Sequence, residues 1–67
     1  RCQLCAEKHS LTPREQEILE YLALGYTAIG IKDKLTISQN TAKSHIKNIY
    51  RKMGVHSQQQ LIDAVFD

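Results

Sequence analysis

The sequence predicts an all-α fold of four helices in one small domain. The chain has 67 residues, and a chain of this length buries only about 60% of the surface that its unfolded form exposes, which supports a single small core. Four segments combine a helix-capping residue with apolar residues at helical spacing. No segment sustains the two-residue alternation of a β-strand, and no Asn-Gly type of turn joins two β-branched runs.

The first helix is predicted over about residues 13–24. Thr12 can cap it, Pro13 suits the first helical position, and Glu15 completes a capping box. Gly25 is a suitable stop after its last turn.

The second predicted helix is short, covers about residues 28–34 and has Thr27 as its cap. Gly30 lies inside it and costs about 1 kcal/mol relative to alanine, so this helix depends on packing against its neighbours. Its apolar stripe consists of Ala28, Ile31 and Leu35.

The third helix has the clearest helical period of the chain and is placed at about residues 39–53. The segment 36–38 predicts a tight turn that ends in the cap Ser38, and Gly54 provides the stop. The apolar positions of this helix are Ala42, Ile46, Ile49, Tyr50 and Met53.

The two ends of the chain carry different signals. Ser57 caps a last helix, with Gln60 at the capping-box position and a broad apolar face behind it. Residues 1–10 show no clear periodicity, so we expect a linker or leading arm there and the folded domain at residues 11–67.

Positive charge is concentrated in the middle of the chain. The net charge is +2 overall, but residues 32–52 carry six Lys or Arg and one Asp, a balance of +5. Residues 1–31 carry −1 and residues 53–67 carry −2. A basic middle between acidic ends predicts a surface directed at a polyanion.

The polar face of the third helix has the chemistry of a nucleic-acid contact. It holds four cations and no acid, whereas solvated helix faces usually mix Glu with Lys. An α-helix fits the major groove of DNA, where Lys, Asn and Ser contact base edges and phosphates. A short helix, a turn and a longer basic helix together predict a helix-turn-helix motif, whose second helix enters the groove.

These segments are similar to the LuxR-type helix-turn-helix domain, also called the GerE or NarL/FixJ type. Residues 11–15 resemble its "LTxRE" opening, and residues 41–46 resemble "TVKxHv". Residues 49–55 resemble "IyxKLgv", and residues 57–64 resemble "sRxeavxxA". The resemblance implies a four-helix fold of the winged-helix-like superfamily without a wing, and a sequence-specific DNA-binding domain of a bacterial transcriptional regulator.

The chain departs from the family pattern at three places. Ala28-Ile29-Gly30 stands where an Asn-Lys-Glu-like stretch is usual, and Lys32 stands where alanine is usual. Lys32 or Lys34 can supply the phosphate contact that residues 28–30 of the second helix do not offer. Gln58 replaces an arginine that would be a partner for Glu15, whose own capping-box bond then has to suffice if it is buried.

The resemblance also implies roles for single residues. The base-reading positions are Lys43, Ser44 and Lys47. The positions expected to contact phosphates are Thr27, Ser38, Thr41, His45, Asn48, Arg51 and Lys52. The candidates for dimerisation through the last helix are Leu61, Ile62 and Val65, although some of these three must serve the core instead.

The expected partners follow from this resemblance. They are double-stranded operator DNA, a second copy of the chain on that DNA, RNA polymerase, and a sensor or receiver domain attached in a longer parent protein. We expect the domain to act in the cytoplasm, and the missing part of the parent can be a soluble or a membrane-embedded sensor.

Other classes of function have weaker support. Cys2, Cys5 and His9 provide three of the four ligands of a structural zinc site, so the fourth would have to be His45 or His56. No thioredoxin-like pattern surrounds the two cysteines, and no glycine elbow or oxyanion loop accompanies His9. We therefore assign no metal site, no cofactor and no catalytic residue. The competing interpretation is a helical protein-interaction adaptor that does not bind DNA.

Overall fold

The structure, a computed structural model, describes residues 2–67 and is all-α, as predicted. Within these residues there are five helices and no strands. The helices are α1 (Cys2–Lys8), α2 (Pro13–Ala23), α3 (Ala28–Leu35), α4 (Gln39–Met53) and α5 (Gln58–Phe66). Helices α2 to α5 are the four predicted helices, and α1 is a fifth that lies in the segment assigned to a linker.

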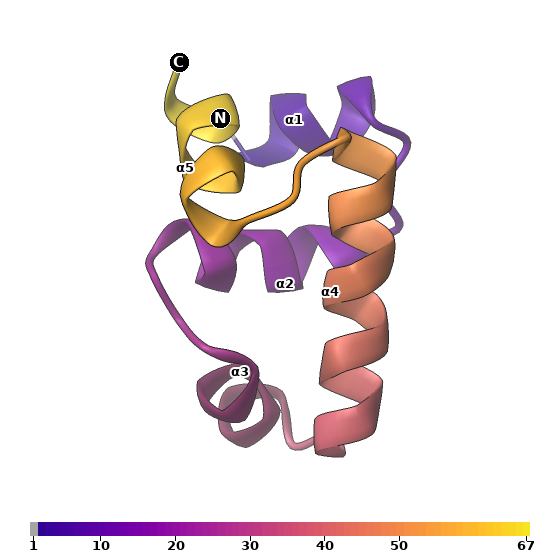
Figure 1. Ribbon diagram of the computed structural model, residues 1–67. Coiled ribbons are helices and arrows are strands. Elements are labelled where there is room, and N and C mark those ends of the chain that lie inside the picture. Colours follow the sequence, from indigo (N-terminus) through magenta and orange to yellow (C-terminus); the bar gives the residue numbers. More distant parts are fainter. Residues whose placement is uncertain (1) are drawn as a thin grey trace.

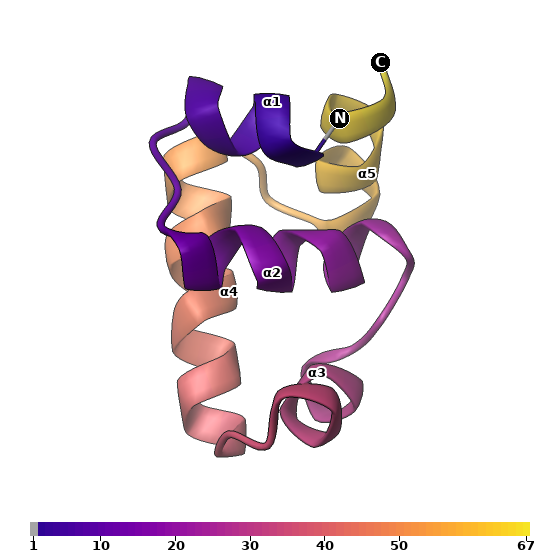
Figure 2. The ribbon, with the colours of Figure 1, turned by 180° about the vertical axis from the view of Figure 1, so that it is seen from behind.

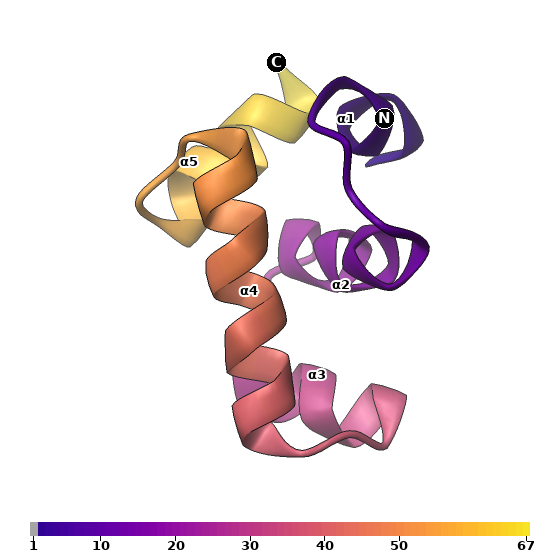
Figure 3. The same cartoon turned by 90° about the vertical axis from the view of Figure 1, so that its right-hand side faces the viewer.

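The helices α2 and α4 form the centre of the domain. Helix α4 runs along one side of the molecule, and α2 crosses it and packs against it (Figure 1). Helix α3 packs against the N-terminal half of α4, whereas α5 packs against α2 at the other end (Figures 1 and 3). Seen from behind, α1 packs along α2, at the end of the molecule where the C-terminus is found (Figure 2). In residues 2–67, no helix combines the length and apolar character that crossing a membrane requires.

The four predicted N-caps are confirmed by hydrogen bonds. Thr12 Oγ1 accepts from the Glu15 N–H at 3.1 Å, and Glu15 Oε1 accepts from the Thr12 N–H at 2.9 Å, which completes the capping box. Ser57 Oγ accepts from the Gln60 N–H at 3.1 Å, but Gln60 Oε1 accepts from the N–H of His56 at 2.8 Å, one residue before the cap. Thr27 and Ser38 cap their helices in the same way. Local sequence thus sets where these helices begin.

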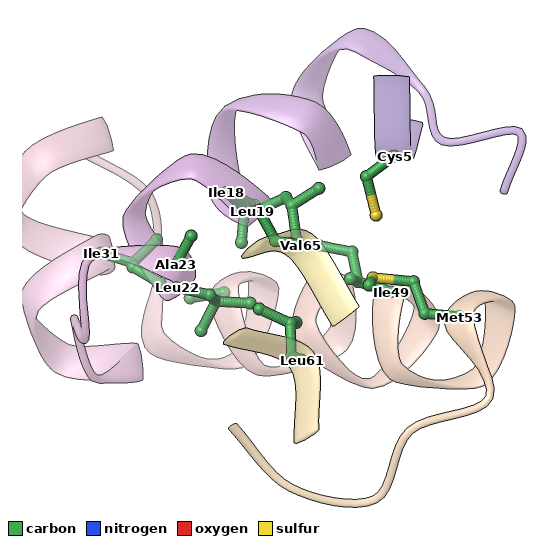
Figure 4. Packing of buried hydrophobic residues seen from close by; sticks show 11 residues of the cluster. Cys5, Ile18, Leu19, Leu22, Ala23, Ile31, Ile49, Met53, Leu61 and Val65 are labelled. Carbon is green, nitrogen blue, oxygen red and sulfur yellow. The ribbon is translucent and has the colours of Figure 1, made fainter. Parts of the chain in front are cut away.

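Helix α1 corrects the expectation for the N-terminal segment. Cys5 and Ala6 are buried at 8% and 3% exposure, and the Cys5 thiol points into the core (Figure 4). The helix ends at Lys8, and Ser10 then turns the chain with a positive φ of 57°. A helix of two turns without a capping residue leaves almost no periodic signal, so only its packing on α2 reveals it.

The core is formed by buried side chains from all five helices (Figure 4). Its fully buried large side chains are Ile18, Leu19, Ile31, Ile49 and Leu61. Leu61 is 0% exposed and Val65 6% exposed, so these two dimerisation candidates serve the core instead. Of the three dimerisation candidates, Ile62 is half-buried and keeps part of its side chain at the surface.

Residues of the two connections that flank α3 contact the helix or the core. The turn between α3 and α4 carries Thr36 in the left-handed region, at φ 54° and ψ 49°, while Ile37 packs against the core. In α3 itself, a Cβ on Gly30 would lie 3.2 Å from Cδ2 of Tyr26, a tight contact that a small shift of the ring would have to relieve. This contact favours a glycine at a position where glycine weakens the helical signal of α3.

Candidate nucleic-acid interface

Helix α4 is held by its apolar side and presents its polar side to solvent. Ala42 and Ile49 are 0% exposed, and Met53 is 9% exposed. These residues recur at helical spacing and therefore anchor one stripe of α4 along its whole length. The tight turn before α4 and the packing of α3 against it produce the helix-turn-helix arrangement that the sequence predicts.

The exposed side of α4 gathers most of the predicted DNA contacts. Lys43, Lys47 and Arg51 are exposed and follow one another at intervals of four residues, so they form one row. Among the described residues, no carboxylate lies within ion-pair distance of these three cations. Asn40, Thr41 and Ser44 are also exposed, and His45 and Asn48 are half-buried. This face is therefore positively charged, and no neighbouring acidic side chain among the described residues neutralises its three cations.

Lys52 has a different environment from the other cations of α4. Its Nζ lies 2.7 Å from Oε1 of Glu15 and donates a hydrogen bond to it. The Lys52 side chain is 26% exposed, and Glu15 is the one buried charged residue within residues 2–67. The structure thus gives Lys52 a role inside the domain, whereas the sequence predicted a phosphate contact.

The Glu15 carboxylate is stabilised in its charged form. Burial alone raises its pKa, but the hydrogen bond from Lys52, the bond from the Thr12 N–H and the charge of Lys52 together hold the pKa below its usual range. The sequence-based expectation left Glu15 with its capping box alone. The pair joins the first turn of α2 to the last turn of α4, and this long-range link has no signature in the local sequence.

Thr27 and Ser38 lie at the N-termini of the two helix-turn-helix elements. Thr27 Oγ1 accepts from the Gly30 N–H at 3.2 Å. Ser38 Oγ accepts from the Thr41 N–H at 3.0 Å and donates to Thr41 Oγ1 at 2.8 Å. Their hydroxyl groups are therefore used in capping. The remaining backbone N–H groups in the first turn of each helix can still donate hydrogen bonds to a phosphate.

The departures from the family pattern have structural counterparts. Gln58 Nε2 donates to the carbonyl oxygens of Leu22 at 3.0 Å and Tyr26 at 2.9 Å, which ties α5 to the connection after α2. Lys32 pairs with Asp33 at 2.9 Å, and Lys34 Nζ lies 6.0 Å from the centre of the Tyr26 ring. The cations of α3 thus have neighbouring partners, whereas Lys43, Lys47 and Arg51 of α4 have no ion-pair partner among the described residues.

The chain matches known families and proteins over most of its length. Residues 9–65 match the family model described as "Bacterial regulatory proteins, luxR family". The probable transcriptional regulatory protein SgaR of Hyphomicrobium methylovorum is 52% identical over 46 residues, which cover 69% of this chain and 22% of that protein. The Fimbriae Z protein of Escherichia coli K12 is 47% identical over 53 residues, which cover 79% of this chain and 25% of that protein.

A third relative matches a slightly longer stretch of the chain. The transcriptional regulatory protein DegU of Brevibacillus brevis is 41% identical over 54 residues, which cover 81% of this chain and 23% of that protein. The chain thus spans about a quarter of the length of these relatives. No solved structure gives a significant match to the chain.

Proposed function

The chain belongs to the luxR family of bacterial regulatory proteins, and we propose that it binds double-stranded DNA sequence-specifically as the output domain of a bacterial transcriptional regulator. The observation that carries this proposal is the exposed, acid-free face of α4 with its row of Lys43, Lys47 and Arg51. Such a face, on the second helix of a helix-turn-helix pair, suits the major groove in width and in charge.

In this arrangement, different positions of α4 contact different parts of the DNA. Lys43, Ser44 and Lys47 are exposed along one side of the helix and reach base edges. Phosphates are contacted by the positions around them, which are Thr27, Ser38, Thr41, His45, Asn48 and Arg51. Lys52 is left out of this set because its ammonium group is held at Glu15.

A single domain of this size makes a modest contact with DNA, about 600–1,000 Å² of protein surface. We therefore propose that the regulator binds as a dimer on two half-sites, with Ile62 as the remaining candidate on α5. The rest of the longer protein supplies a sensor or receiver domain and controls assembly. Contact with RNA polymerase then converts binding into regulation.

Titration of a labelled duplex at several salt concentrations tests DNA binding. Contacts with Z phosphates release counterions, so the logarithm of the binding constant falls against the logarithm of salt concentration with a slope of about −0.9Z. Binding that is absent or insensitive to salt would contradict the proposal and would favour a protein-interaction adaptor.

Substitutions then test the orientation of α4. Lys47→Ala is expected to lower discrimination between a selected operator and random duplex by about 1–3 kcal/mol, because its ammonium group no longer reaches a base edge. The matched control is Lys8→Ala, which removes an exposed cation from α1 at the other end of the domain. If Lys47→Ala binds the operator as tightly as Lys8→Ala does, α4 does not read the groove through this residue.

A further inference from the structure

A groove of about 730 Å³ runs beside the row of cations on α4. The first residue of α3 and the connection between α4 and α5 complete its walls. The lining residues are Ala28, Lys43, Ile46, Lys47, Tyr50, Arg51, Gly54, Val55 and His56. Lys43 and Lys47 therefore belong both to this groove and to the proposed base-reading set.

The groove combines an apolar floor with a basic edge. Ile46, Tyr50 and Val55 are half-buried and offer aliphatic and aromatic surface between the helices. Lys43, Lys47 and Arg51 follow one long side, each one turn after the last, with no carboxylate among the lining residues. DNA recognition needs these cations, and the apolar floor beside them also offers a surface to a ligand that combines an apolar part with a negative charge.

The dimensions suit a small elongated molecule. The lining residues of α4 extend from Lys43 to Arg51, which is about 12 Å at a rise of 1.5 Å per residue. The volume lies within the range of about 300–1,000 Å³ that is typical of small-molecule sites, which are mostly apolar with a few placed polar groups.

We propose that this groove binds an amphipathic organic anion, such as a medium-chain alkyl carboxylate, and that the bound anion competes with DNA. The alkyl chain covers Ile46, Tyr50 and Val55, and the carboxylate pairs with the row of cations. Competition rests on the proposed function, because the same lysines serve both ligands. Binding of the anion alone does not depend on it.

A second hollow, about 590 Å³ in volume and lined by α1, α4 and α5, serves as an internal comparison. It also offers apolar surface, from Leu4, Met53 and Val65. Its polar groups have mixed charge, since Asp67 lines it together with Lys8 and His9. A ligand that seeks only apolar surface enters both hollows, whereas an amphipathic anion selects the groove beside α4.

Sodium decanoate, decanol and decylammonium form a matched set of probes with one chain and three head groups. Backbone amide NMR of the isolated domain, recorded with each probe, locates binding without DNA. Decanoate is expected to shift the amides of residues 43–56, with affinity about tenfold higher than that of decanol and with decylammonium weaker still. Equal affinity for decanoate and decanol, or shifts centred on the second hollow, would overturn the proposal.

Two alanines provide the matched variants. Ala28→Leu places a larger side chain in the groove, and Ala64→Leu makes the same change in the second hollow. Ala28→Leu is expected to weaken decanoate binding about tenfold while Ala64→Leu leaves it unchanged. Should Ala28→Leu disturb folding, Val55→Ser removes apolar floor instead. Unchanged decanoate affinity in the folded groove variant would refute the assignment.

Displacement of labelled operator by decanoate completes the test. Wild type is expected to release DNA as decanoate rises, whereas Ala28→Leu keeps its DNA affinity and resists displacement. If decanoate binds beside α4 but DNA remains bound, the two ligands do not compete, and that part of the proposal fails. If no duplex binds at any salt concentration while the amide shifts remain, the proposed function fails and the anion site stands.

Discussion

Replacement of Lys52 by methionine tests the most consequential long-range contact in the domain. Glu15 is only 4% exposed and receives hydrogen bonds from Lys52 Nζ at 2.7 Å and from the Thr12 N–H at 2.9 Å. Methionine keeps the length of the side chain but removes the ammonium group. Glu15 then retains its charge in a buried position with one main-chain donor, which favours the unfolded state.

The size of the effect follows from the burial of the two partners. Breaking a fully buried ion pair costs about 3–5 kcal/mol. The Lys52 side chain is 26% exposed, so water screens part of the interaction and the expected loss is about 2 kcal/mol. In a domain of this size, that loss lowers Tm by about 8–16 °C. Urea unfolding followed by circular dichroism measures the change in free energy of unfolding.

The pH dependence provides a second measurement of the same contact. The pKa of Glu15 is lower in the folded state than its usual value, so its stabilising contribution is present above the unfolded pKa, near 4.3, and is lost as pH falls through the lower folded pKa. The difference between wild type and Lys52→Met is therefore expected to be large at neutral pH and to shrink as the pH falls through the folded-state pKa of Glu15.

The matched control is Lys47→Met, which removes an exposed cation from the same helix and is expected to change stability by less than about 0.5 kcal/mol. Adding Glu15→Gln to Lys52→Met removes the stranded charge, so the double variant is expected to be more stable than Lys52→Met alone. Equal stability of Lys52→Met and Lys47→Met at neutral pH would refute the reasoning.

Two further predictions concern the last helix and the turn before α4. Leu61→Glu places a charge at a fully buried position and is expected to unfold the domain, which thermal unfolding measures. Ile62→Glu, at a half-buried position, is expected to leave the domain folded and to weaken operator binding, which duplex titration measures. A folded Leu61→Glu domain would contradict the assignment of Leu61 to the core. Thr36→Gly relieves a β-branched residue at φ 54° and is expected to stabilise the domain by up to about 1 kcal/mol, while Gly54→Ala, at φ 69°, is expected to cost about 1 kcal/mol. A lower Tm for Thr36→Gly than for wild type would show that the left-handed turn carries no strain.

The helix boundaries were predictable because their causes are local. Thr12, Thr27, Ser38 and Ser57 each cap a helix through a bond to an N–H three residues later, and such bonds are encoded within four residues of sequence. The period of α4 was equally clear. Helix α1 was missed because two turns without a cap give no such local signal, and its Cys5 and Ala6 are ordered by packing against the core.

The candidate site was predictable in its chemistry and less so in its geometry. The concentration of cations in residues 32–52 and the absence of acid from α4 can be counted along the chain. The sequence does not show which of those cations form ion pairs within the folded domain. The Lys52–Glu15 pair spans 37 residues, and Lys32 turns to its neighbour Asp33.

The amino-acid sequence determined the fold class, the four capped helices and the basic face of α4, since each depends on residues close together along the chain. Tertiary structure alone decided that Leu61 and Val65 belong to the core, that Lys52 neutralises Glu15, and that an apolar groove lies beside the basic row. These three features arise where helices distant in sequence meet, because burial and pairing depend on which surfaces face one another in space.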